Sequence, residues 1–119
     1  MGFTEKDMYP VAQEALRRRY PASAGWEIHF RQKREGYEPD FVVERKTWLG
    51  TIVRAVAEVK AECVVTREHV RQLNQYVRNL SGGNVKIVAK HLIVPVGADT
   101  SIVPSDVEVI TLRAFKCRR

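Results

Sequence analysis

Cysteine is scarce in this sequence, with two residues in a chain of 119, Cys63 and Cys117. Their positions lack the close spacing of metal ligands, and no secretory context favours a disulfide between them. We therefore expect two reduced thiols in a cytoplasmic protein, and we exclude a cysteine-ligated metal centre.

Long hydrophobic runs are also missing, and none approaches the length of a membrane-spanning helix. The sequence is polar from Thr4 to Asp7, so no signal peptide is expected. Repeats, low-complexity blocks and linkers are absent as well. Because 119 residues with 45% hydrophobic content suffice for one core only, we predict a single domain over residues 1–119 and no membrane partner.

Acidic residues are fewer than basic ones, 14 against 20, and the resulting net charge of +6 favours a polyanionic partner. Among the basic residues of the first half, Arg31 and Lys33 are candidate phosphate contacts. The alternative is a solvated basic surface that serves only solubility. The positive charge of this half comes from Arg17, Arg18, Arg19, Arg31, Lys33, Arg34, Arg45 and Lys46.

Charged residues interrupt one apolar segment, residues 53–61, and this is the most informative feature of the sequence. The segment is typical of a central strand, because every second residue is apolar: Val53, Ala55, Ala57, Val59 and Ala61. The opposite face carries Glu58 and Lys60, whose side chains therefore project together. Buried charges are costly unless they are paired, ligated or catalytic.

A second strand begins at Asp40, directly after Pro39, and a turn-compatible link over residues 47–51 joins it to the strand with Glu58. Antiparallel pairing would bring Asp40 close to Glu58. Two carboxylates and one ammonium in this arrangement can hold a divalent metal and a water beside a phosphate. Taken alone, Glu58 and Lys60 also fit an ordinary ion pair.

Pro39, Asp40, Glu58 and Lys60 together resemble the motif of the PD-(D/E)xK nuclease superfamily, which includes many restriction enzymes, Holliday-junction resolvases and RecB-type exonucleases. The resemblance implies the restriction-endonuclease-like α/β fold, a mixed sheet of three antiparallel strands and one parallel strand flanked by helices. The implied order is helix, three strands, helix, strand and a last short strand. The matching segments are residues 4–20, 25–32, 40–44, 53–61, 66–81, 84–96 and 107–112.

The resemblance also implies an acidic residue on the first helix that points at the metal site. Glu5 falls near the middle of the apolar face of this helix and Glu14 on the opposite side, so Glu5 is the candidate. The alternative for Glu5 is a first-turn acid that complements the helix dipole. We expect Pro10 to kink the helix or to mark a later start near Tyr9.

On the second helix, Gln72 and Tyr76 resemble the Gln-x-x-x-Tyr motif that follows the catalytic lysine in RecB-type nucleases. The resemblance makes both of them candidate substrate-binding residues. Glu58 departs from that subgroup, which usually has Asp-x-Lys, and is closer to the resolvase and restriction-enzyme pattern. The alternative for Gln72 and Tyr76 is the polar flank of an amphipathic helix with a half-buried ring.

The expected function is Mg²⁺-dependent hydrolysis of DNA phosphodiesters by an endonuclease rather than an exonuclease, with Mn²⁺ as a substitute ion. Asp40, Glu58 and the carbonyl of Val59 would bind the ion, Lys60 would act on the attacking water, and Glu5 would assist. The implied partners are DNA and either a second copy of the chain or a targeting protein. Two rivals are a catalytically inactive nucleic-acid-binding subunit on the same fold and an interaction protein with a buried ion-pair network.

Overall fold

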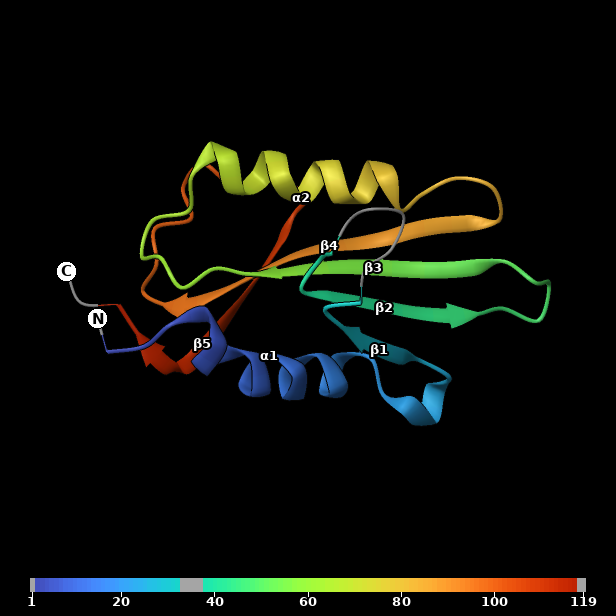
Figure 1. The fold of residues 1–119 in the computed structure, drawn as a ribbon, viewed down its shortest axis with the longest axis horizontal. Coiled ribbons are helices and arrows are strands. Elements are labelled where there is room, and N and C mark those ends of the chain that lie inside the picture. The colour runs from blue at the N-terminus through green and yellow to red at the C-terminus, as the bar shows by residue number, and fades with distance from the viewer. Residues whose placement is uncertain (1, 33–37, 118–119) are drawn as a thin grey trace.

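The computed structural model describes residues 2–32 and 38–117 and has a mixed α/β fold (Figure 1). Two α-helices and five strands make up its regular structure in these ranges, together with a short 3₁₀ turn. In chain order the elements are α1 (Glu5–Arg19), η1 (Ala22–Ala24), β1 (Glu27–Phe30), β2 (Phe41–Lys46), β3 (Ile52–Val59), α2 (Arg67–Asn79), β4 (Val85–Val96) and β5 (Glu108–Lys116).

The five strands form one sheet in the order β1-β2-β3-β4-β5. The pairs β1/β2 and β2/β3 are antiparallel, whereas β3/β4 and β4/β5 are parallel. Strand count and order therefore differ from the implied sheet of three antiparallel strands and one parallel strand. The final segment was expected to be a short strand over 107–112, but it continues to Lys116 and pairs with β4 along most of its length.

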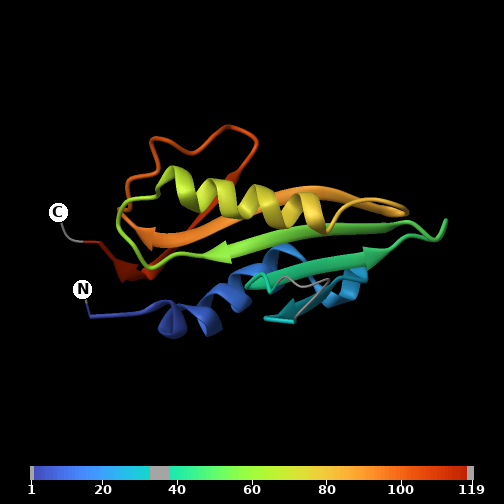
Figure 2. The ribbon, with the colours of Figure 1, turned by 45° about the horizontal axis from the view of Figure 1, so that its top comes forward.

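The sheet is the middle of three layers, with α1 on one face and α2 on the other (Figures 1 and 2). Residues of α1 pack on Ala55, Ala57 and Val59, and residues of α2 pack on Val42 and Val56. β3 is thus covered on both faces, as its sequence indicates. None of the described helices is long and apolar enough to cross a membrane.

The first helix begins at Glu5, so a later start near Tyr9 is wrong. Thr4 is its N-cap as expected, and the Asp7 carboxylate accepts a hydrogen bond of 2.8 Å from the Thr4 backbone N–H. Pro10 lies inside the helix with its ring exposed, and the helix continues past it to Arg19. Met8, Ala12 and Leu16 are fully buried, because the apolar face of α1 covers the sheet.

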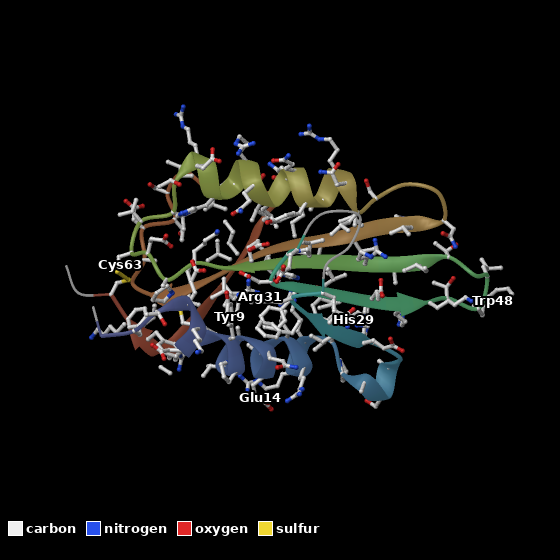
Figure 3. The ribbon with its side chains drawn as sticks, viewed as in Figure 1. Tyr9, Glu14, His29, Arg31, Trp48 and Cys63 are labelled. Atoms are coloured by element: carbon white, nitrogen blue, oxygen red, sulfur yellow. A yellow bond between two sulfur atoms is a disulfide. The ribbon has the colours of Figure 1, made fainter. Side chains whose placement is uncertain are left out.

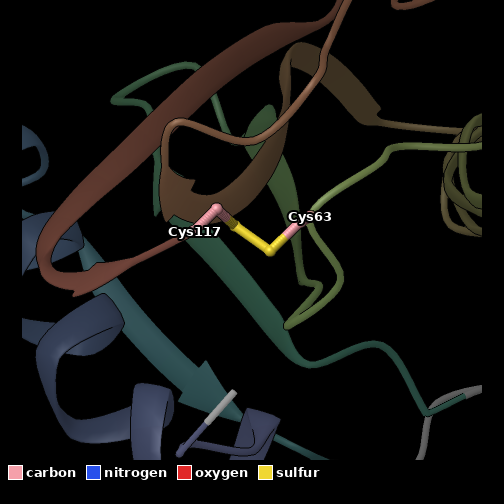
Figure 4. Close-up of a disulfide and its surroundings, with 2 residues drawn as sticks. All are labelled: Cys63 and Cys117. Carbon is pink, nitrogen blue, oxygen red and sulfur yellow. A yellow bond between two sulfur atoms is a disulfide. The ribbon is translucent and has the colours of Figure 1, made fainter. Parts of the chain in front are cut away.

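Cys63 and Cys117 form a disulfide (Figure 4), so the expectation of reduced thiols is wrong. The two Cα atoms are 5.6 Å apart although 54 positions separate the residues in sequence. Cys63 follows β3 and Cys117 follows β5. Because β3, β4 and β5 run parallel, their carboxyl ends reach the same edge of the sheet and bring the two cysteines together.

We expect the disulfide to stabilise the fold substantially, because it closes a long loop in the unfolded chain. Replacing both cysteines in a Cys63→Ser, Cys117→Ser variant should lower the free energy of unfolding by about 2–4 kcal/mol. Urea unfolding of the variant and of the oxidised parent measures the difference. Equal midpoints for the two proteins would contradict a stabilising role.

Candidate active site

Asp40 and Glu58 face each other where β2 begins and β3 ends. Phe41 pairs with Ala57 in the β2/β3 register, which places Asp40 beside Glu58. The Asp40 backbone N–H donates to Glu58 Oε1 at 3.2 Å, and the Val59 N–H donates to Asp40 Oδ2 at 2.8 Å. Each carboxylate is therefore anchored by the backbone of the opposite segment. The predicted proximity of these two residues is confirmed.

The environment of Glu58 opposes its ionisation. Glu58 is only 4% exposed and Asp40 only 8%. Burial, followed by repulsion from Asp40, raises the pKa of Glu58 from 4.5 to about 9. The ammonium of Lys60 acts in the opposite direction, but it does not outweigh burial. At neutral pH the pair therefore holds one proton, and a bound cation would have to displace it.

Lys60 is linked to α2 through the two motif residues of that helix. The Lys60 Nζ donates to Gln72 Oε1 at 2.8 Å, and Gln72 Nε2 donates to the Tyr76 hydroxyl at 3.4 Å. Burial, and then the charges of Glu58 and Asp40, raise the pKa of Tyr76. The structure therefore brings Gln72 and Tyr76 to the site from the α2 side, while their role in substrate binding stays a prediction.

Glu5 reaches the site from α1, on the other side of the sheet. Burial raises its pKa, which also responds to the charges of Lys60 and Asp40 and to a hydrogen bond from the Ala61 backbone. Glu14, by contrast, forms an ion pair of 3.2 Å with Arg17 on the exposed side of α1 (Figure 3). Of the two acidic residues considered on this helix, only Glu5 lies near the candidate site.

Tyr9 also belongs to the site, although its sequence position indicated only an apolar face residue. Its hydroxyl donates to Asp40 Oδ1 at 3.3 Å. Burial, followed by the charges of Asp40 and Glu5, raises the pKa of Tyr9 to about 12, so the hydroxyl keeps its proton. One signal was available: Tyr9 follows Glu5 by four positions, which places both side chains on the same side of a helix.

Arg31 lies next to this cluster (Figure 3). Its guanidinium is 5.9 Å from the centroid of the Tyr9 ring and forms an ion pair of 3.1 Å with Glu38, and this pairing raises the pKa of Arg31. Its backbone N–H donates to the carbonyl of Asp40 at 2.9 Å. Lys33, the other candidate phosphate contact, lies outside the described residues.

The donor set at the site consists of hard oxygens. The described residues contain no group of three or more His, Cys, Asp or Glu that could hold a metal ion, so the protein ligands here would be the two carboxylates of Asp40 and Glu58 and the Val59 carbonyl. Mg²⁺ suits such a set, because it prefers oxygen and keeps several of its waters. A cation would also relieve the repulsion that raises the pKa of Glu58.

Comparisons with protein-family models, with curated proteins and with solved structures gave no significant match. The resemblance to the nuclease superfamily therefore depends on Pro39, Asp40, Glu58 and Lys60, together with their placement on the sheet.

The raised pKa of Glu58 makes the stability of the protein depend on pH. The folded state keeps a proton that the unfolded state has lost, so the free energy of unfolding should fall as the pH rises from about 4.5 towards about 9. Glu58→Gln keeps the neutral shape and removes this loss. We expect its stability relative to the parent to increase by up to about 1.4 kcal/mol per pH unit in this range.

Urea unfolding at pH 5, 7 and 8.5 in the presence of a chelator measures this difference. Glu14→Gln is the matched control, because Glu14 lies on the exposed side of α1, and its curve should run parallel to that of the parent. A difference between Glu58→Gln and the parent that does not change with pH would show that Glu58 is ionised in the folded protein.

Proposed function

We propose that this protein is a Mg²⁺-dependent nuclease of the PD-(D/E)xK type that hydrolyses phosphodiester bonds in DNA. One observation carries the proposal: Asp40, Glu58 and Lys60 are neighbours at the end of the β2/β3 pair, where two acids share a buried contact. A purely structural role explains this contact poorly, because burial and repulsion oppose the ionisation of Glu58.

Asp40, Glu58 and the Val59 carbonyl would hold Mg²⁺ in the proposed enzyme. When bound, the ion would neutralise the two carboxylates and stabilise negative charge on the scissile phosphate. Glu58 would give up its proton on binding, so the affinity for the ion should rise with pH. The Tyr9 hydroxyl and the Val59 N–H fix the orientation of the Asp40 carboxylate through one oxygen each.

Lys60 would orient or deprotonate the attacking water and would stabilise charge in the transition state. Its ammonium is held by the side-chain oxygen of Gln72, which α2 presents to the site. Gln72 therefore acts as a positioning residue for Lys60 in this proposal, and Tyr76 supports Gln72 through its hydroxyl.

The substrate would be bound by charge and guided by structure more than by sequence. The chain has a net charge of +6, and Arg31 lies beside Asp40 where it could contact a phosphate next to the cleaved bond. One site cuts one strand, so cleavage of both strands would need a second copy of the chain or a targeting partner. We propose an endonuclease, with Mn²⁺ as a substitute for Mg²⁺.

The decisive test is the removal of the Lys60 ammonium. We expect Lys60→Ala to lower Mg²⁺-dependent cleavage at least a hundredfold, because the charge that acts on water and transition state is lost. DNA binding in the presence of a chelator should stay within about threefold of the parent, since one phosphate contact at most is removed. Gel assays with plasmid, linear duplex, single-stranded and branched DNA measure cleavage, and fluorescence anisotropy measures binding.

Lys116→Ala is the matched control, because it removes an exposed lysine at the far end of β5. Full activity of Lys60→Ala would rule out this site. Metal-independent binding by the parent without any cleavage would instead favour an inactive nucleic-acid-binding subunit, and neither binding nor cleavage would favour an interaction protein.

The two helix-borne acids allow a paired comparison. We expect Glu5→Gln to lower the cleavage rate about tenfold or more, because Glu5 contributes negative charge next to Lys60 and Asp40. Glu14→Gln should cleave at the rate of the parent, since Glu14 pairs with Arg17 away from the site. Equal rates for both variants in a Mg²⁺ titration would limit Glu5 to a structural role in the first turn of α1.

A further inference from the structure

The tip of the β2–β3 hairpin carries two large apolar side chains that the fold does not use. Trp48 is 92% exposed and Leu49 is 72% exposed, the highest values among the large hydrophobic residues that the structure describes. They are adjacent in sequence and lie at one end of the long axis of the molecule (Figure 3). An exposed apolar pair of this kind marks a contact surface more often than an isolated exposed residue does.

The backbone of the tip is held in place by hydrogen bonds, so the exposure of Trp48 and Leu49 does not come from a loose loop. The Thr47 N–H donates to the Thr51 carbonyl at 2.7 Å, and the Gly50 N–H donates back to Thr47 at 3.0 Å. The side chain of Asn84, just before β4, donates to the Gly50 carbonyl at 3.1 Å. Gly50 has a φ of +87°, which a residue with a side chain rarely adopts.

Positive charge surrounds the tip. Arg45 and Lys46 line a shallow hollow of about 620 Å³ together with Trp48 and Leu49. The Arg45 guanidinium stacks over the Trp26 ring at 4.8 Å, which fixes it on this side of the hairpin, and Lys46 is exposed. An aromatic ring next to two cations is the combination that binds a nucleic acid strand, because the ring stacks on a base while the cations neutralise phosphates.

Other occupants fit the tip less well. A stable dimer needs about 800 Å² from each partner, whereas two side chains of this size supply about 400 Å² at most. Insertion into a membrane surface normally uses the whole apolar face of an amphipathic helix rather than two residues at a turn. A single base needs a single ring, so the size of the tip matches an unpaired nucleotide.

The tip is rigidly connected to the candidate site through β3. Six strand steps from Ile52 to Glu58 span about 20 Å, which equals roughly six base-pair steps of 3.4 Å. We propose that Trp48 and Leu49 form a base-stacking contact for unpaired nucleotides about six steps from the bond that is cut. The inference rests on the proposed function, and it narrows the substrate to DNA in which a duplex adjoins an unpaired segment.

The test uses the full chain in the presence of a chelator, so that no cleavage interferes with binding. The probes are a single strand, a blunt duplex and a duplex with splayed single-stranded arms, all of equal length. We expect Trp48→Ala to bind the splayed and single-stranded probes about tenfold more weakly, because one base stack is lost, and to bind the blunt duplex within about threefold of the parent.

Two variants serve as controls. Trp48→Phe keeps an aromatic ring and should retain most of the affinity, whereas Ile102→Ala removes another exposed apolar side chain and should bind as the parent does. Splayed DNA should also quench the tryptophan fluorescence of the parent more than that of Trp48→Phe, in which Trp26 alone remains.

Equal affinity of the parent and Trp48→Ala for splayed DNA would overturn the inference. So would a Trp48-dependent affinity for anionic phospholipid vesicles, or a Trp48-dependent self-association, with no effect on DNA. A Trp48 effect on DNA without Mg²⁺-dependent cleavage would reject the proposed nuclease and leave the stacking contact supported. No binding to any of the three probes would reject both.

Discussion

The contact between two buried carboxylates, Asp40 and Glu58, is the constraint on which the arrangement of the site depends. Each accepts a hydrogen bond from the backbone of the opposite segment, so the β2/β3 register sets their separation. Burial and repulsion together keep one proton on the pair near neutral pH. The surrounding groups then have defined tasks, because Tyr9 orients one carboxylate and Gln72 holds the neighbouring Lys60.

Much of the fold could be predicted from periodicity, because the strands and helices bury simple apolar faces. The alternation of residues 53–61 identified β3, and the stripe of Val70 and Leu73 identified α2. The extent of β5 was underestimated, since its burial pattern is irregular and its pairing with β4 depends on distant residues. The disulfide was missed for the same reason, because parallel strand ends meet only in three dimensions.

The candidate site was predictable where one strand pair or one helix face determines it. Asp40 lies beside Glu58 because the β2/β3 hairpin requires it, and Glu5 lies on the predicted side of α1. Tyr9 was assigned only to packing, since periodicity reports the face of a helix and not the polar partner of a hydroxyl. Contacts between separate elements, such as that from Lys60 to Gln72, needed the structure.

The disulfide divides the chain into two parts that differ in covalent topology. Residues between Cys63 and Cys117, which include α2, β4 and β5, form a closed ring, whereas α1, β1, β2 and β3 remain an open chain. The site lies on the seam, because Tyr9, Asp40 and Glu58 come from the open part and Gln72 from the ring. Fraying of the open part would therefore dismantle the site while the ring stayed intact.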